Sequence, residues 1–370
     1  ASMIHSEMRR HGIKLLLGYT VEGFREKDHE AEVLLKDNPS LRADMVILAI
    51  GVTPDTALAK EAGLELGIKG SIVVNDRMET SVPDIYAAGD AVQVKHYVTG
   101  EDTLLSLAGP ANKQGRIIAD HICGDDSRYP GSQGSSVIKV FDMTAATTGI
   151  NETNARRAGL QVDTVILSPM SHAGYYPGGK VMTMKVVFEK ATCRLLGAQI
   201  IGYEGVDKRI DVLATAIHAG MKATQLKDLD LAYAPPYSSA KDPVSMAGFM
   251  IDNITKEILK QWHLEDMDAV LKEEGAVLLD VRTVQEYSRG HISGFINIPL
   301  DELREHIHEI EKGKPVYLIC QSGLRSYIAS RILEGYGYET YNFSGGFRYY
   351  DAVVNDRALI ERAYACGMDY

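Results

Sequence analysis

Cys320 is the residue of this sequence best placed for covalent chemistry. It follows the apolar run 316–319, and the residues after it are Gln321, Ser322, Gly323, Leu324 and Arg325. In a turn from a strand into a helix, backbone N–H groups can point inward, and with the start of the helix and an arginine they stabilise a thiolate or a persulfide. We therefore predict that Cys320 is a catalytic sulfur nucleophile assisted by Arg325, and that residues 321–324 form its loop.

Three further cysteines, Cys123, Cys193 and Cys366, lack such surroundings. They are widely spaced and form no Cys-x-x-Cys motif, so the sequence indicates neither a disulfide framework nor a zinc site, and no metal centre is expected. We expect them to be packing or surface residues. This use of cysteine is typical of the reducing cytoplasm.

The composition argues against several classes of partner. The chain has 370 residues, 45% of them hydrophobic and 24% charged, which is ordinary for two or three globular domains. A formal net charge of −11 argues against a nucleic-acid-binding surface. The longest apolar runs, such as 45–52, have the length of a strand, so neither a membrane span nor a signal peptide is expected.

A second pattern precedes the cysteine loop. Asp280 and Arg282 stand at the end of an expected strand, and the stretch 281–299 follows it. Together with the cysteine loop and the turn 344–347, this stretch resembles the rhodanese domain, to which we assign 262–370. We expect Asp280 and Arg282 to brace the loop, which is a residue shorter than in relatives that cleave phosphate esters and therefore favours sulfur over a phosphate.

The stretch 80–91 carries a different signal. Pro83 begins a short apolar run suited to a buried strand, and Gly89 then lets the backbone approach a ligand where Asp90 presents its carboxylate. The stretch resembles the second flavin-contacting motif of the FAD-dependent pyridine nucleotide-disulphide oxidoreductases. The resemblance implies that Gly89, Asp90 and Ala91 bind FAD, with the aspartate accepting a hydrogen bond from the ribitol chain.

A second flavin contact is expected within 106–119. Pro110 suits the first turn of a helix, and the free N–H groups there, at Ala111 and its neighbours, can face the pyrimidine edge of a flavin. Lys113 lies in the same turn, where a cation gains nothing from the helix dipole. Either a phosphate of coenzyme A or simple solvation of a surface lysine would account for it.

The N-terminal segments indicate a partial fold. The stretch 43–56 resembles the segment by which this oxidoreductase family returns from its NAD(P) domain to its FAD domain, although a plain buried strand accounts for it equally well. A start in a helix rather than a strand is unusual for a parallel sheet. We expect 1–52 to be the end of an NAD(P)-binding domain and 53–130 the second half of an FAD-binding domain, with a redox cysteine and both glycine fingerprints upstream.

The missing fingerprint has a consequence for cofactor binding. The chain contains no Gly-x-Gly-x-x-Gly turn, which anchors dinucleotide phosphates at the positive end of a helix. We therefore expect these residues to bind FAD poorly without the rest of the fold.

The segment 136–252 resembles the dimerisation domain of the same family, which implies a homodimer. Two aromatic, proline-bearing loops at 172–179 and 233–243 narrow the resemblance to the coenzyme A-disulfide reductase branch.

Regular elements are expected throughout the chain. They are helix 4–12, strands 13–17, 137–141, 162–167, 276–280 and 316–319, helices 151–158, 207–219, 265–272 and 301–312, and a hairpin over 181–201.

The branch implies roles for residues of these loops. Tyr175 and Tyr233 are assigned to the site, Tyr233 near the flavin, and Lys241 to the phosphates of coenzyme A. A phenol can hydrogen-bond a thiolate or donate a proton to it, and lysine is a compact charge for phosphate. Tyr176 and Tyr237 are the competing candidates, and rigid interface packing is the simpler alternative.

The sequence therefore predicts a multi-domain α/β and α+β protein. The resemblance implies reduction of coenzyme A disulfide, or of CoA persulfide or polysulfide, with NAD(P)H and FAD, coupled to sulfane-sulfur handling by Cys320. One alternative is a stand-alone rhodanese sulfurtransferase on an incomplete reductase scaffold. The other is a non-enzymatic dimeric scaffold whose cysteine loop binds an anion.

Overall fold

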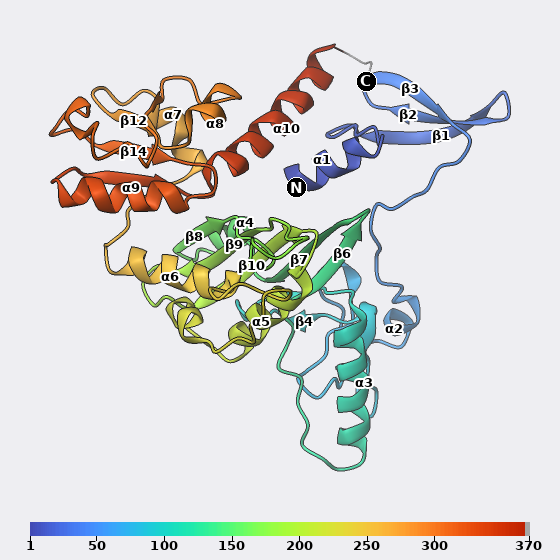
Figure 1. The fold of residues 1–370 in the computed structure, drawn as a ribbon. Helices are drawn as coiled ribbons and strands as arrows, with labels where there is room; N and C mark the ends of the chain where they lie inside the picture. The colour runs from blue at the N-terminus through green and yellow to red at the C-terminus, as the bar shows by residue number, and fades with distance from the viewer. Residues whose placement is uncertain (367–370) are drawn as a thin grey trace. The chain divides into compact units, whose positions relative to one another are not determined.

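The chain forms two compact units in a computed structural model that describes the backbone of residues 1–366 and the side chains of residues 1–360 (Figure 1). The large unit comprises Ser135–Val354 with Ala1 and Met3, and the small unit comprises Ile4–Gly134 with Ser2 and the chain from Asn355 onward. The large unit contains the cysteine loop and both tyrosine loops.

The first half of the large unit is an antiparallel sheet of five strands in the order β6-β7-β10-β9-β8. The side chains at the centre of this sheet are fully buried, and they include Val165, Met184, Val186 and Ile200. Burial on a pleated surface favours the β-branched residues that are frequent in these strands. Its elements are β6 (Ser136–Val140), β7 (Met143–Gly149), α4 (Glu152–Arg157), β8 (Val162–Leu167), β9 (Thr183–Glu189), β10 (Leu195–Gly202), α5 (Val206–His218), the short 3₁₀ helix η3 (Ala223–Asp228) and α6 (Pro243–Thr255).

The second half is a parallel sheet of five strands in the order β11-β15-β14-β12-β13. On one face of the sheet, Leu279 and Leu318 form a core with Ala329 of α9. The other face carries the aromatic core of Trp262 and Phe343. Its elements are β11 (Gln261–Trp262), η4 (Leu264–Asp266), α7 (Met267–Val270), β12 (Val277–Asp280), α8 (Val284–Ser288), β13 (Ile296–Asn297), η5 (Ile307–Glu309), β14 (Val316–Ile319), α9 (Leu324–Gly335), β15 (Thr340–Phe343) and α10 (Gly346–Cys366). Figure 1 shows α9 and α7 on opposite faces.

The small unit has a small core, formed by Met78, Val92, Val94 and Tyr129. It contains an antiparallel sheet in the order β1-β2-β3 and the long helix α3. Its elements are α1 (Ser2–Arg10), β1 (Val21–Lys27), β2 (Glu30–Leu35), β3 (Asn38–Ala43), α2 (Ala57–Glu61), η1 (Ile68–Gly70), η2 (Gly89–Ala91), β4 (Val94–Lys95), β5 (Asp102–Thr103) and α3 (Ala108–Ile122).

Two predicted strands of the small unit are wrong, and a third that was kept as an alternative does not form. Residues 13–17 and 45–52 have no regular structure, and the run after Pro83 makes only the isolated bridge of Tyr86 with Glu79. Ile50 is 90% exposed, so the structure does not support the buried strand offered as the alternative for 43–56. A strand requires a neighbour for its backbone hydrogen bonds, and none of the described residues pairs with 45–52.

The elements of the large unit follow the predictions more closely. The strands at 162–167 and 316–319 form as predicted, and the multi-domain α/β and α+β class is confirmed. The helix predicted over 301–312 is wrong, because turns with i to i+3 hydrogen bonds, such as Leu303 N to Leu300 O, bury the same apolar side chains. The predicted helix 265–272 is reduced to η4 and α7, and the strands β7, β11, β13 and β15 were not predicted. None of the described helices combines the length and apolar character needed to cross a bilayer.

A buried ion pair joins the elements of the first half. Arg209 on α5 is 1% exposed and donates to the Asp242 carboxylate, with 2.9 Å between Nη2 and Oδ2. The same guanidinium donates to the backbone oxygens of Ser171 and Tyr237 and to Ser238 Oγ. Asp242 Oδ1 accepts from Val244 N and caps α6. One pair therefore fixes both tyrosine loops to α5 and α6.

Replacing Asp242 with alanine is expected to destabilise the large unit by about 3 kcal/mol, because it leaves the Arg209 charge buried without a partner. The exposed pair of Lys256 with Asp252 supplies a matched control, and Lys256→Ala is expected to cost less than about 0.5 kcal/mol. Urea unfolding followed by circular dichroism measures both. Equal effects of the two substitutions would contradict the structural role of the buried pair.

Candidate active site at the Cys320 loop

The sulfur of Cys320 lies inside a turn that two secondary-structure elements define. Strand β14 ends at Ile319, and Gly323, with φ of +96°, precedes α9. Cys320 is fully buried. Its Sγ accepts hydrogen bonds from Gly323 N at 3.1 Å and from Ser326 Oγ at 3.2 Å. An amide and a hydroxyl thus stabilise negative charge on the sulfur.

The first turn of α10 holds the outer side of this loop. Phe347 N donates to Cys320 O at 2.8 Å, and Arg348 N donates to Gln321 O at 3.1 Å. Gly346 has φ of +68°, and a Cβ there would lie 2.7 Å from Ser322 N. Because its carbonyl groups are engaged by α10, the loop can turn N–H groups toward the sulfur.

Arg325 is engaged by a carboxylate. Its Nη1 and Nη2 each lie 2.7 Å from one oxygen of Glu286, a fork-to-fork geometry that favours a strong ion pair. This hydrogen bonding lowers the pKa of Glu286 to about 2 and raises the pKa of Arg325, to which the nearby Cys320 adds a smaller electrostatic contribution. The sequence predicts that the Arg325 guanidinium assists the Cys320 sulfur directly. In the structure, Glu286 binds this guanidinium and holds it near the sulfur.

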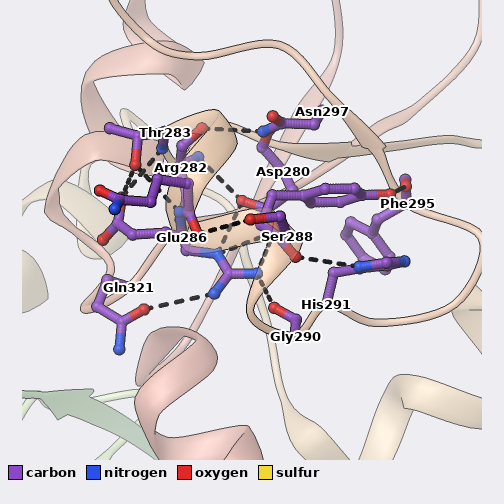
Figure 2. Close-up of polar contacts among 12 residues, drawn as sticks. Asp280, Arg282, Thr283, Glu286, Ser288, Gly290, His291, Phe295, Asn297 and Gln321 are labelled. Atoms are coloured by element: carbon purple, nitrogen blue, oxygen red, sulfur yellow. Dashed lines mark hydrogen bonds and ion pairs between the residues drawn. The ribbon is translucent and has the colours of Figure 1, made fainter.

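Asp280 and Arg282 form a second, fully buried pair beside the loop (Figure 2). Arg282 Nη2 lies 2.7 Å from Asp280 Oδ2 and also donates to Gly290 O. The Arg282 guanidinium carbon lies 3.8 Å from the centre of the Phe347 ring, and Nη1 lies 3.5 Å from Gln321 Oε1. These contacts connect the end of β12 to the loop and to α10, as a brace would.

The tyrosine loops meet at their phenol groups. The hydroxyls of Tyr175 and Tyr233 lie 3.1 Å apart, and this hydrogen bond raises the pKa of Tyr233. Tyr176 instead packs against the His172 ring, and the Tyr237 side chain is 71% exposed. The geometry thus pairs the two tyrosines that the resemblance singles out, and their chemical roles stay predictions.

Lys241 lines a cavity of about 570 Å³ in the large unit, which we call the loop cavity. One wall consists of Ser322, Gly323 and Leu324 from the cysteine loop, together with Tyr327 and Asn342. The other wall comes from residues 167–170, His172, Gly174, Ser239, α6 and Leu259. The cavity therefore borders the cysteine loop and one tyrosine loop at once.

The expected flavin residues lie in the small unit. Gly89 has φ of +86° and donates through N to Gln114 Oε1 at 2.7 Å, and η2 packs against α3. Asp90 is exposed in η2, and α3 contains Pro110, Ala111 and the exposed Lys113 within its first turns. A Cβ at Gly89 would meet no atom within 4 Å, so the backbone there faces open space.

Four residues of these networks were missed by the sequence analysis. Glu286 stands three residues after Thr283 and forms the capping box of α8, a pattern that the sequence displays. Ser326 follows Arg325 directly, but only the first turn of α9 turns it toward the sulfur. The buried roles of Gln114 and Arg209 have no local signal, because each depends on long-range packing.

The remaining cysteines and acids form no further site. Cys123 is exposed and Cys193 partly buried, whereas Cys366 lies outside the described side chains. Among the residues that the structure describes, no group of histidine, cysteine and acidic side chains is arranged to hold a metal ion.

Family models match three consecutive parts of the chain. Residues 1–115 match pyridine nucleotide-disulphide oxidoreductase, and residues 135–243 match the dimerisation domain of that family. Residues 263–352 match the rhodanese-like domain.

Relatives with described functions match about two thirds of the chain or less. An NAD(P)H sulfur oxidoreductase (CoA-dependent) of Pyrococcus abyssi is 37% identical over 242 residues, which are 65% of this chain and 54% of the relative. A coenzyme A disulfide reductase of Staphylococcus aureus is 33% identical over 219 residues, 59% of this chain and 50% of the relative. The chain spans about half the length of the curated relatives it matches.

Two solved structures are similar to the chain over nearly its full length. Reduced CoADR-RHD of Bacillus anthracis has a TM-score of 0.92 and 45% identity, covering 96% of this chain and 64% of that protein. An NAD-dependent persulfide reductase from A. fulgidus has a TM-score of 0.86 and 39% identity, covering 94% of this chain and 63% of that protein. The chain therefore belongs to the pyridine nucleotide-disulphide oxidoreductases and carries a C-terminal rhodanese-like domain.

Proposed function

We propose that this chain serves the NAD(P)H- and FAD-dependent reduction of coenzyme A disulfide, or of CoA persulfide or polysulfide, and that Cys320 handles the sulfane sulfur. The observation that carries the proposal is the buried Cys320 sulfur with its two hydrogen-bond donors, in a chain whose relatives are named for CoA-dependent sulfur reduction. The proposed reductase activity requires the whole protein. The large unit alone supports only one part of the proposal, the handling of sulfur by Cys320.

The proposed step at Cys320 is nucleophilic. The thiolate attacks the outer sulfur of a sulfane donor, the donor's sulfur bond breaks, and the leaving group departs with the electron pair. Gly323 N and Ser326 Oγ hold the negative charge, while the Asp280 and Arg282 pair keeps the loop in place. The same groups would stabilise the persulfide until a second thiolate removes its outer sulfur.

The tyrosine pair is proposed to act on the coenzyme A thiol. Tyr233 donates a proton to the leaving thiolate, and Tyr175 holds its hydroxyl in position at 3.1 Å. The Tyr233 phenol can donate because it carries its proton at neutral pH, as tyrosine ordinarily does. Lys241 and Lys113 are proposed to attract the phosphates of the coenzyme, since both are exposed cations.

The chemistry of the small unit fits FAD. The exposed Asp90 would accept hydrogen bonds from ribitol hydroxyls, and the N-terminal end of α3, which contains Pro110 and Ala111, would face the flavin ring. The N–H of Ala111, which the sequence predicts to be free, instead donates to Leu107 O at 3.2 Å within the helix. When bound, FAD supplies the acceptor for the hydride of NAD(P)H and the electron pair that reduces a disulfide. The open space beside Gly89 admits a ligand without moving the backbone.

The domain plan is also a proposal. We assign 1–52 to the NAD(P)-binding domain, 53–130 to the FAD-binding domain, 136–252 to the dimerisation domain and 262–370 to the rhodanese domain. The match of residues 135–243 to a dimerisation domain supports a homodimer through 136–252. Unpaired cysteines among the described residues suit a reducing cytoplasm.

A second candidate is a sulfurtransferase that works without the reductase. It is favoured by the large unit, which contains Cys320, its two sulfur-bound donors and its brace. The two candidates differ in whether NAD(P)H is consumed.

Treatment with a sulfane donor, either thiosulfate or an organic persulfide, is expected to add one sulfur atom to Cys320. Intact-protein and peptide mass spectrometry measure the adduct and its position. Cys320→Ser should abolish it, whereas Cys193→Ser, which removes a partly buried thiol elsewhere in the large unit, should leave it in place. An unmodified Cys320 with every donor would refute sulfur handling by this loop.

Oxidation of NAD(P)H by the flavin-loaded protein, with coenzyme A disulfide as acceptor, tests the reductase. We expect Tyr233→Phe to lower kcat by about 100-fold, the scale of a lost general acid. Tyr237→Phe is the matched control, because it removes the competing phenol, which is 71% exposed, and leaves the hydrogen bond between Tyr175 and Tyr233 in place. A protein without a flavin absorbance band would restrict the reductase to a longer protein that contains the rest of the fold, whereas equal activity in both variants would contradict the role of Tyr233.

The ion pair of Glu286 with Arg325 predicts a pH dependence. Because the pKa of Glu286 falls from 4.5 to about 2 on folding, the pair contributes stability above pH 4.5 and loses it as the pH falls toward 2. The contribution is about 1 kcal/mol or less, since the pair is partly exposed. Urea unfolding of the parent and of Glu286→Gln should differ at pH 6 and converge in acid; a constant difference would contradict the pair.

A further inference from the structure

Three donors surround the carbonyl oxygen of Gly323, the residue that precedes α9. The backbone N–H of Tyr327 donates to this oxygen at 3.1 Å, as the first turn of the helix requires. Asn342 on β15 donates to it through Nδ2 at 3.2 Å, and the Ser326 hydroxyl lies 3.1 Å away. A carbonyl oxygen has two lone pairs, so it can accept only two of these hydrogen bonds at full strength.

The Ser326 hydroxyl has a choice between two acceptors. It carries one hydrogen, and it lies 3.1 Å from Gly323 O and 3.2 Å from Cys320 Sγ. Ser326 and Cys320 are fully buried, so water does not compete for this hydrogen. Because Tyr327 N and Asn342 Nδ2 already fill both lone pairs of Gly323 O, the hydroxyl is left to donate to the sulfur.

The Asn342 side chain keeps its amide at a cost to stability. It is 3% exposed, and its Oδ1 has no hydrogen-bond partner among the described residues, which is unfavourable for a buried carbonyl. Gly323 O can only accept, so the amide nitrogen must face it and Oδ1 must point away. A leucine has the same branched shape without an unpaired oxygen. The hydrogen bond to Gly323 O is therefore what the amide contributes at this position.

We propose that Asn342 is a positioning residue of the sulfur site, which occupies Gly323 O and thereby directs the Ser326 hydroxyl to Cys320. Ser326 contacts the reacting sulfur, whereas Asn342 acts only through Ser326. This inference rests on the proposed sulfur handling by Cys320 and adds a residue to it. Without the amide, the Ser326 hydrogen divides its time between Gly323 O and the sulfur, and the thiolate loses part of its stabilisation.

The experiment measures sulfur addition to Cys320 from thiosulfate, with the full chain under single-turnover conditions and mass spectrometry as the readout. In this step the thiolate attacks the outer sulfur of thiosulfate, and sulfite leaves with the electron pair of the broken S–S bond. We expect Ser326→Ala to slow the addition by about tenfold, the scale of one hydrogen bond to a charged group. Asn342→Leu is expected to slow it by about fivefold, because part of the Ser326 contact remains.

The double variant separates positioning from a merely structural effect. If Asn342 acts through Ser326, Asn342→Leu should change the rate by less than about twofold once Ser326→Ala is present, whereas independent effects would multiply to about fiftyfold. The ultraviolet absorbance of the thiolate, taken as the part that Cys320→Ser removes, should follow the same pattern without any sulfur donor. Equal effects of Asn342→Leu in both backgrounds, or no effect in the parent, would overturn the proposal.

Thr340→Val is the matched control on the same strand. Thr340 is 1% exposed like Asn342, but its hydroxyl donates to Glu334 and not to the cysteine loop, so both readouts should stay unchanged. Circular dichroism establishes that each variant is folded, and Asn342→Val, which suits a strand, replaces Asn342→Leu if the latter does not fold. A normal thiolate pattern without sulfur addition in the parent would refute sulfur handling by Cys320 and leave the role of Asn342 standing, so the two failures are distinguishable.

Discussion

The contact between the first turn of α10 and the cysteine loop is the constraint on which the site depends. Two amides of α10 bind the carbonyls of Cys320 and Gln321, and Gly346 must lack a side chain for this approach. With its carbonyls fixed outward, the loop can offer N–H groups to the sulfur. The buried Asp280 and Arg282 pair adds a link from β12 to the same turn, through the Phe347 ring.

The two halves of the large unit share the surroundings of this loop. Ile166 N at β8 donates to Ser344 Oγ just before α10, and Asn253 on α6 donates to the Tyr327 hydroxyl on α9. Through these contacts the first half of the large unit, which matches the dimerisation domain, forms a wall of the loop cavity. The cavity that borders the cysteine loop is therefore one that the rhodanese-like half does not form alone.

The sequence was most informative where chemistry and local structure coincide. The strand ending before Cys320 and the two braces, Asp280 and Arg282, could be predicted because a short apolar strand and a glycine-bearing turn are local features. The ion pair between Arg325 and Glu286 could not be predicted, since it joins α9 to α8, which lie far apart in the sequence. The apolar composition of 45–52 is compatible with a buried strand, but most of the run is exposed in the structure. Composition does not reveal whether a neighbouring strand exists to pair with it.

The central claim is that the turn between β14 and α9 cradles a persulfide on Cys320. A crystal structure of the protein after treatment with a sulfane donor tests it most directly. The account predicts a second sulfur bonded to Cys320 Sγ, enclosed by the loop and within hydrogen-bonding distance of loop N–H groups. Density for a second sulfur that points away from the loop amides, or a loop detached from α10 with the sulfur in place, would contradict it.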